Sequence, residues 1–171
     1  MQKHQHRECG DHLVVNTFLP FADYTKSAQA LDYKRLGKQR VEAWQILQAL
    51  RGQTKGWVNH PATRMWVGHE KSLCEYGIAI CDEWIRRGYK DTMRERFIAV
   101  YSELPDCEKP NWSFNRTLYR SHQSNLKRKD PDHYNFDVED DLPYLWIDAE
   151  TKMIKWGKKP NENKSKESAI N

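Results

Sequence analysis

A single carboxylate stands among several cations in the first half of the sequence. Glu42 is the first acid after four cations, Lys34, Arg35, Lys38 and Arg40. In such surroundings a carboxylate stays ionised and can stabilise a cationic, sugar-like transition state. The spacing is equally typical of an exposed Glu that pairs with a Lys four residues earlier on a helix. The residues alone leave both interpretations of Glu42 open.

A second group of charges has one sign only. Between residues 115 and 129 there are five basic residues and no acid. At helical spacing Arg116, Arg120 and Lys127 share one face, which suits contacts with phosphate groups. The alternative is a solvated face that only keeps the protein soluble. His122 lies on the apolar side of the same helix, where a half-buried structural histidine is the expected reading by spacing.

The remaining candidate ligands indicate no metal centre. His4, His6, Cys9 and His12 match no standard zinc spacing. The four cysteines follow no disulfide pattern either, so we expect reduced thiols in a cytosolic protein. Core packing is the first expectation for the many aromatic residues. Those near the basic segment could also stack on a base, namely Trp112, Tyr119, Tyr134, Tyr144 and Trp146.

Helical periodicity predicts the elements that must position these groups. A length of 171 residues is enough for one domain with its own core. We expect a mainly α, compact single-domain bundle with a short C-terminal hairpin turning near 148–151. Thr25 is the expected N-cap of the first helix, and later helices are expected over 36–50, 70–87, 92–101 and 113–129.

The chain ends and the absence of long apolar runs complete the predicted organisation. We expect a disordered leader over 1–14, a helical domain over 15–156 and a disordered tail over 157–171. No apolar run reaches about 18 residues, so no membrane span is predicted. The charged start precedes no apolar block, which argues against a secretory signal.

Several strings resemble one enzyme family. Residues 17–21 (TFLPF) and 31–42 (LDYKRLGKQRVE) are similar to the opening of pyrimidine-dimer DNA glycosylases of the endonuclease V type. Residues 57–62 and 81–92 fit the middle helices of the same family, and residues 120–134 and 141–146 resemble the C-terminal part of its uncharacterised bacterial and phage branch. It covers about residues 16–146.

The resemblance implies a chemistry. In that family a nucleotide is flipped out of DNA, and the α-amine of the processed N-terminus attacks the sugar C1′ with help from a glutamate. Glu42 falls at the place of that glutamate, and Asn16 or Thr17 falls at the place of the terminus. The residues then expected to contact DNA are Arg35, Arg40, His60, Arg64, Arg116, Arg120, His122 and Lys127.

This sequence departs from the family pattern because about 15 residues precede Asn16. Three alternatives follow: the leader is removed, Lys38 supplies the amine, or water attacks and the enzyme is a glycosylase only. We expect a DNA repair-type glycosylase that acts on duplex DNA, with a pyrimidine dimer as the first candidate substrate. If an amine is the nucleophile, abasic-site lyase activity is expected as well. The expected protein is a monomer without cofactor, located in the cytoplasm (at the nucleoid, or in a host if phage-encoded).

Two other functions are kept. A non-catalytic DNA-binding protein could retain the fold, and the displaced N-terminus favours it. A structural or interaction protein is the third possibility, in which the acidic stretch 137–141 folds back onto the basic helix.

Overall fold

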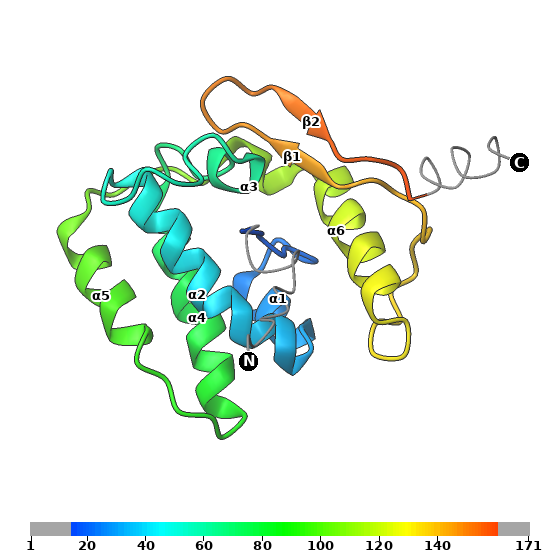
Figure 1. The fold of residues 1–171 in the computed structure, drawn as a ribbon, viewed down its shortest axis with the longest axis horizontal. Coiled ribbons are helices and arrows are strands. Elements are labelled where there is room, and N and C mark those ends of the chain that lie inside the picture. The colour runs from blue at the N-terminus through cyan, green and yellow to red at the C-terminus, as the bar shows by residue number, and fades with distance from the viewer. Residues whose placement is uncertain (1–14, 161–171) are drawn as a thin grey trace, which may run out of the picture.

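A computed structural model describes residues 15–160 as a mainly α fold, which confirms the predicted class (Figure 1). Within that part of the chain no helix is long and apolar enough to cross a membrane. The elements are α1 (Tyr24–Ala30), α2 (Tyr33–Leu50), α3 (Pro61–Arg64), α4 (Glu70–Arg86), α5 (Arg94–Glu103), a 3-10 helix (Asn111–Phe114), α6 (Arg116–Lys129), β1 (Leu145–Ile147) and β2 (Ile154–Trp156).

Side-chain caps set where the helices begin. Asp23 accepts a hydrogen bond from the Lys26 N–H and caps α1, so the predicted cap at Thr25 is wrong by two residues. His60 caps α3 through Nδ1, directly before Pro61. Asn115 caps α6, which therefore begins after the 3-10 helix and not at residue 113.

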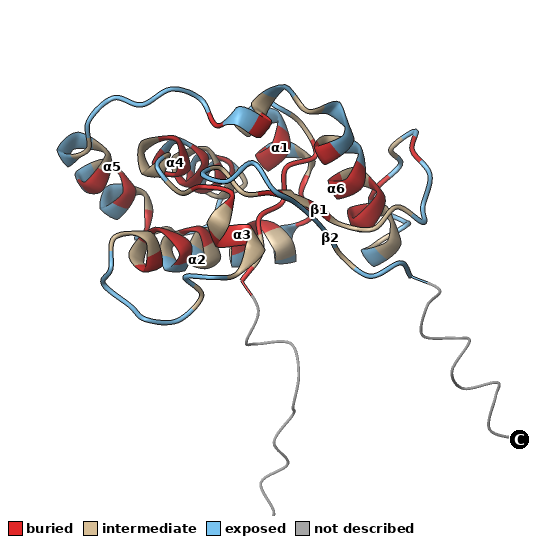
Figure 2. Ribbon diagram, turned by 90° about the horizontal axis from the view of Figure 1, so that it is seen from above, coloured by how far each residue is buried: buried red, intermediate tan, exposed pale blue. Residues whose placement is uncertain are grey.

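Helices α2 and α4 pack side by side, and α1 and α5 both lie against α4 (Figure 1). Their inner faces are buried while their outer faces are exposed (Figure 2). Leu47 and Ile80 lie in this shared core, as the periodicity predicts. Trp84 is only partly buried, because it stacks on Tyr89 at the edge of the core.

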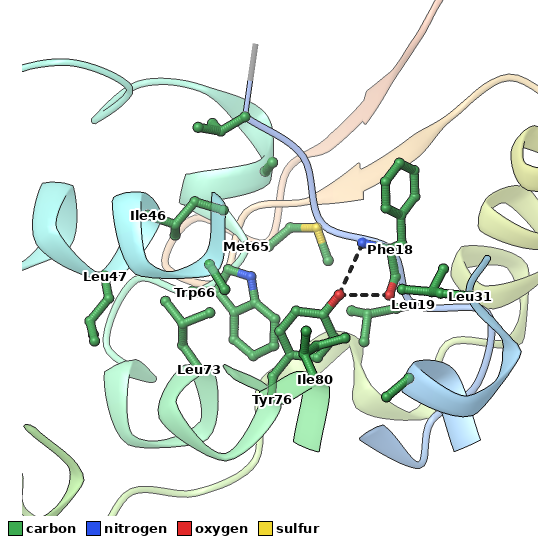
Figure 3. Close-up of a cluster of buried hydrophobic side chains, with 14 of the residues drawn as sticks. Phe18, Leu19, Leu31, Ile46, Leu47, Met65, Trp66, Leu73, Tyr76 and Ile80 are labelled. Carbon is green, nitrogen blue, oxygen red and sulfur yellow. Dashed lines mark hydrogen bonds between the residues drawn. The ribbon is translucent and has the colours of Figure 1, made fainter. Parts of the chain in front are cut away.

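The extended segment before α1 runs through the middle of the molecule. Leu19 is fully buried and Phe18 nearly so. The Tyr76 hydroxyl donates to the Phe18 carbonyl at 2.9 Å, and the Phe18 N–H approaches the same hydroxyl at 3.3 Å (Figure 3). The Leu19 N–H donates to His122 Nδ1 at 3.0 Å, which joins the segment to α6. This segment links the α2–α4 layer to the C-terminal elements.

The C-terminal hairpin is confirmed. Strands β1 and β2 are antiparallel, with Leu145 opposite Trp156 and Ile147 opposite Ile154. In the turn, the Asp148 carboxylate accepts the N–H groups of Glu150 and Thr151, both at 2.9 Å. The predicted leader and most of the predicted tail lie outside the described residues.

Gly77 tests the packing of α4 on α5. A Cβ at this position would lie 2.5 Å from the Phe97 ring, which is closer than carbon atoms approach. We expect Gly77→Ala to lower the free energy of unfolding by about 1 to 3 kcal/mol in a urea titration, because the overpacked ring must move. Gly56→Ala is the control, since nothing lies within 4 Å of its Cβ. Equal stability of the two variants would contradict this packing.

Candidate functional site

A cavity of about 370 Å³ opens where the central segment meets α2 and the end of α6. Its lining combines one carboxylate, an asparagine and an aromatic ring with four cations. The residues are Asn16, Phe18, Lys34, Arg35, Lys38, Glu42 and Lys129. The structure thus brings together Asn16, Arg35, Lys38 and Glu42, four of the residues selected from the sequence.

Helical spacing on α2 and one aspartate place the cavity cations. Lys34, Lys38 and Glu42 repeat every four residues and therefore lie along one side of α2. Asp32 caps α2 and also accepts a hydrogen bond from Arg35 Nη1 at 3.1 Å, which orients that guanidinium. Burial alone would raise the pKa of Asp32, but hydrogen bonds from Tyr134 and Arg35 lower it below its ordinary value. Arg35 therefore has an ionised partner.

Glu42 is more buried than its cationic surroundings suggested. Burial raises the pKa of Glu42 from its ordinary 4.5 to about 7. The charge of Lys38, the Asn16 backbone N–H and the Gln39 side chain oppose this effect without cancelling it. The prediction that Glu42 is ionised on a solvent-facing surface is therefore corrected. It is a partly buried acid that changes charge near neutral pH, as general acids and bases do.

Gln39 holds this arrangement together, and sequence reasoning missed it. Its side chain is fully buried, and Nε2 donates to Glu42 Oε2 at 2.7 Å and to the Asn16 carbonyl at 3.0 Å. Its Oε1 accepts the Tyr76 hydroxyl at 2.6 Å and the Phe18 N–H at 3.3 Å. One amide thus fixes Glu42 relative to the central segment. A polar residue within the apolar arc of α2 was the signal in the sequence.

Tyr144 extends the site from the C-terminal part of the chain. Its hydroxyl is buried, and burial strongly raises its pKa. The groups that act on this hydroxyl are the Asn16 side chain and the charges of Arg128, Arg35 and Glu42. Its ring stacks on Trp146 with centroids 5.0 Å apart. The sequence offered Tyr144 only as one of several aromatic residues that could stack on a base.

Thr17 points away from the cavity. Its side chain is fully buried, and its hydroxyl accepts a hydrogen bond from Trp66 Nε1 at 3.2 Å. Its backbone N–H donates to Asn16 Oδ1 at 2.8 Å. Of the two residues predicted at the nucleophile's place, the structure puts Asn16 in the cavity and Thr17 in the core.

Arg40 lies on another side of α2. Its guanidinium pairs with Asp91, with Nε 2.7 Å from Oδ1, and lies 4.9 Å from the centre of the Trp84 ring. Asp91 also accepts the N–H groups of Met93 and Arg94 at the start of α5. Arg40 thus links α2 to the α4–α5 connection. It was predicted to contact a DNA phosphate, but the structure does not place it at the cavity.

His60 and Arg64 belong to a different region, below the hairpin. The His60 ring lies edge-on to Trp57 and Trp146, and burial lowers its pKa, with the Lys155 charge adding to this effect. Arg64 forms two hydrogen bonds with Asp148, at 2.7 and 3.2 Å. Neither residue lines the Glu42 cavity.

The basic helix α6 is largely occupied by the segment that follows it. Arg120 pairs with Glu139 at 2.6 Å, and Lys127 donates to the carbonyls of Phe136 and Val138. The fold-back considered for the acidic stretch is therefore present. His122 is fully buried, and burial lowers its pKa to about 4. It is a neutral core residue, and its predicted contact with DNA is corrected.

Arg116, the third member of the predicted α6 stripe, is exposed and lies outside these contacts with the following segment. In the described part of the chain, no group of three His, Cys, Asp or Glu side chains could hold a metal ion. The tract from His4 to His12 lies outside that part.

The family comparison matches the half of the chain that contains Asn16, Gln39 and Glu42. The model of the pyrimidine dimer DNA glycosylase family matches residues 15–96. Over these residues the chain is similar to the pyrimidine dimer DNA glycosylase family. The resemblance drawn from the sequence is thereby confirmed. No curated protein and no solved structure matches the chain. Lys129 and Tyr144 reach the cavity region from beyond the matched segment.

Gln39 offers a direct test of the site's architecture. We expect Gln39→Leu to lower the free energy of unfolding by about 1 to 3 kcal/mol, because it leaves buried partners without a hydrogen bond. The variant also raises the pKa of Glu42, since it removes a donor to the carboxylate. Urea titration and NMR titration of the carboxyl carbon measure the two effects. Gln45→Leu, an exposed position on the same helix, is the control; an equal change there would contradict the role of Gln39.

Proposed function

We propose that this protein excises a damaged base, with a pyrimidine dimer as the first candidate, from duplex DNA. The observation that carries the proposal is the partly buried Glu42, held beside Asn16 in a cavity lined by cations. The family match supports the class of DNA glycosylase.

The cations of the cavity suit the backbone of an extruded nucleotide. Lys34, Arg35 and Lys38 line one wall, and Lys129 reaches the cavity from α6. Phosphate contacts of this kind position the nucleic acid, while the base is recognised inside a pocket. A cavity of about 370 Å³ has the size of a small-molecule site. The target nucleotide therefore has to leave the base stack to reach Glu42.

In the proposed reaction, the bond between C1′ and the base nitrogen breaks and its electron pair leaves with the base, which takes up a proton. Positive charge develops at C1′, and the Glu42 carboxylate stabilises it. A nucleophile then bonds to C1′ and gives up its proton. Water would leave an abasic site, whereas an amine would form an imine that permits strand cleavage. Protein groups and water suffice for both routes.

Among the possible amines, Asn16 has the strongest structural support. Its backbone nitrogen interacts with the Glu42 carboxylate. That nitrogen is an amide bonded to Val15 and becomes an amine only if the chain is cleaved before Asn16. Lys38 lines the same cavity and is the second candidate, and water is the third.

A non-catalytic DNA-binding protein is the alternative function. The observation that favours it is the peptide bond at Asn16, because an amide nitrogen is not a nucleophile. We also propose that the protein acts as a monomer in the cytoplasm, and these two points stay predictions.

Borohydride trapping distinguishes the routes. The protein is incubated with irradiated duplex DNA and sodium borohydride, which reduces an imine to a stable protein–DNA adduct. We expect cleavage of the C1′–base bond by the wild type, measured as an alkali-labile site, and none by Glu42→Gln, because the amide keeps the shape but loses the charge. An adduct that requires cleavage before Asn16 identifies the Asn16 amine. One that is lost in Lys38→Ala identifies Lys38, and release without an adduct identifies water.

The controls for this experiment are an unirradiated duplex and Gln45→Leu. Base release by Glu42→Gln at the wild-type rate would contradict the role of Glu42. Tight binding without release from any irradiated or modified duplex would contradict the enzyme and support the binding protein.

Titration of Glu42 predicts how stability depends on pH. Its pKa rises from 4.5 to about 7 on folding, so between these values the folded state holds a proton that the unfolded state has released. We therefore expect the stability contributed by protonated Glu42 to be present below pH 4.5 and lost as the pH rises to 7. The difference in unfolding free energy between wild type and Glu42→Gln, measured by urea titration at several pH values, isolates this effect. A difference independent of pH would contradict burial of the carboxyl group.

A further inference from the structure

The hairpin has an apolar strand face that the described structure leaves uncovered. On β1, Leu145 and Ile147 are 1% and 7% exposed. Their cross-strand partners on β2, Trp156 and Ile154, are 52% and 55% exposed. Directly opposed residues lie on the same face of a ribbon. Strand β2 therefore projects beyond the body against which β1 packs, and its apolar side meets solvent. Met153, in the turn, is 69% exposed.

The segment that contains β2 is strongly basic, with one lysine in the strand and three beside it. Between residues 151 and 160 there are four lysines and no acid: Lys152, Lys155, Lys158 and Lys159. Among the described residues, none of these lysines forms an ion pair, whereas the nearby acids Asp148 and Glu150 both pair with Arg64. The positive charge of β2 is thus uncompensated, and exposed apolar groups lie between the charges.

The base of the hairpin adjoins the Glu42 site. The Gly157 N–H donates to the Tyr144 carbonyl at 2.7 Å, which anchors the end of β2. The hydroxyl of the same tyrosine is close enough to the Asn16 side chain and to Glu42 for both to affect its titration. Tyr144 thus joins the base of the hairpin to the region of the Glu42 site. In Figure 1 the hairpin lies at the top, across α3 and the first half of α6.

We propose that the hairpin β1–β2 is a second DNA-binding surface, which contacts the duplex beside the extruded nucleotide. Lys155 of β2 and the lysines that flank the strand neutralise phosphates, and Met153, Ile154 and Trp156 enter the minor groove. Exposed apolar side chains flanked by cations are the combination by which proteins bind and unstack duplex DNA from that groove. This proposal rests on the proposed function, because that function supplies duplex DNA as the ligand. It does not require the protein to be catalytically active.

A salt titration of duplex binding tests the lysines. The full chain binds a fluorescently labelled, undamaged duplex at increasing salt, and anisotropy gives the affinity. For Lys155→Ala/Lys158→Ala we expect the slope of log affinity against log salt to shrink by about 2, because two phosphate contacts are lost. Lys152 is left in place, since its φ of 61° makes substitution at that position strained.

The matched control is Lys90→Ala/Arg96→Ala, which removes two exposed charges near the α4–α5 connection, away from the hairpin (Figure 1). We expect its salt slope to equal that of the wild type. Equal slopes for the hairpin variant and the wild type would overturn the proposal, as would an equal decrease in both double variants. Thermal melts followed by circular dichroism verify that all variants fold.

Trp156→Ala and Met153→Ala test the apolar contact. We expect weaker binding with an unchanged salt slope, because no charge is removed, and less fluorescence from a 2-aminopurine placed in the same undamaged duplex, because that base stays stacked. Unchanged affinity and fluorescence would overturn the apolar contact. Loss of self-association or of a protein partner, with DNA binding intact, would assign the strand to a protein interface instead. Because undamaged DNA is the probe, a protein without excision activity can still confirm or refute the hairpin, so failure of the two proposals is distinguishable.

Discussion

The side-chain amide of Gln39 is the interaction on which the site depends. A single buried group ties Glu42 to the backbone of the central segment and, through Tyr76, to α4. Each of these partners would otherwise be a polar group in a dry interior, at a cost of about 1 to 3 kcal/mol. The geometry of the carboxylate relative to Asn16 is therefore set by the same hydrogen bonds that hold the core together. Site and core cannot vary independently here.

Burial and charge act against each other at Glu42. A fully exposed glutamate among lysines would be ionised at every physiological pH and strongly solvated. A fully buried one would stay protonated. The structure takes an intermediate course, in which burial raises the pKa and the Lys38 charge with two hydrogen bonds brings it back to about 7. Such a group gains and loses a proton easily at neutral pH, which suits a reaction that moves protons and develops positive charge.

Local patterns were enough to predict the helices and the grouping of Lys38 with Glu42, because a period of 3.6 residues governs both, and the hairpin followed from alternation with a period of two. They failed where the partner lies far along the chain. Nothing near Arg40 reveals that Asp91 will pair with it, and nothing near His122 reveals that the Leu19 N–H will require its nitrogen. Thr17 and Asn16 are adjacent, yet an extended chain sends successive side chains to opposite sides, one to the core and one to the cavity.

The position of Asn16 joins these points into one constraint. The central segment is buried on both sides of Asn16, at Val15 and Thr17, and at Asn16 it lines the cavity. Whatever precedes Asn16 is therefore attached at the site itself, next to Glu42. Whether the Asn16 backbone nitrogen is an amide or an amine thus bears directly on the reaction. The hydrogen bonds from Gln39 and Tyr76 are made to the carbonyl groups of residues 16 and 18, so they do not depend on the state of that nitrogen. The scaffold of the site consequently does not require a free amine. The state of the Asn16 nitrogen decides only whether water or an amine is the nucleophile.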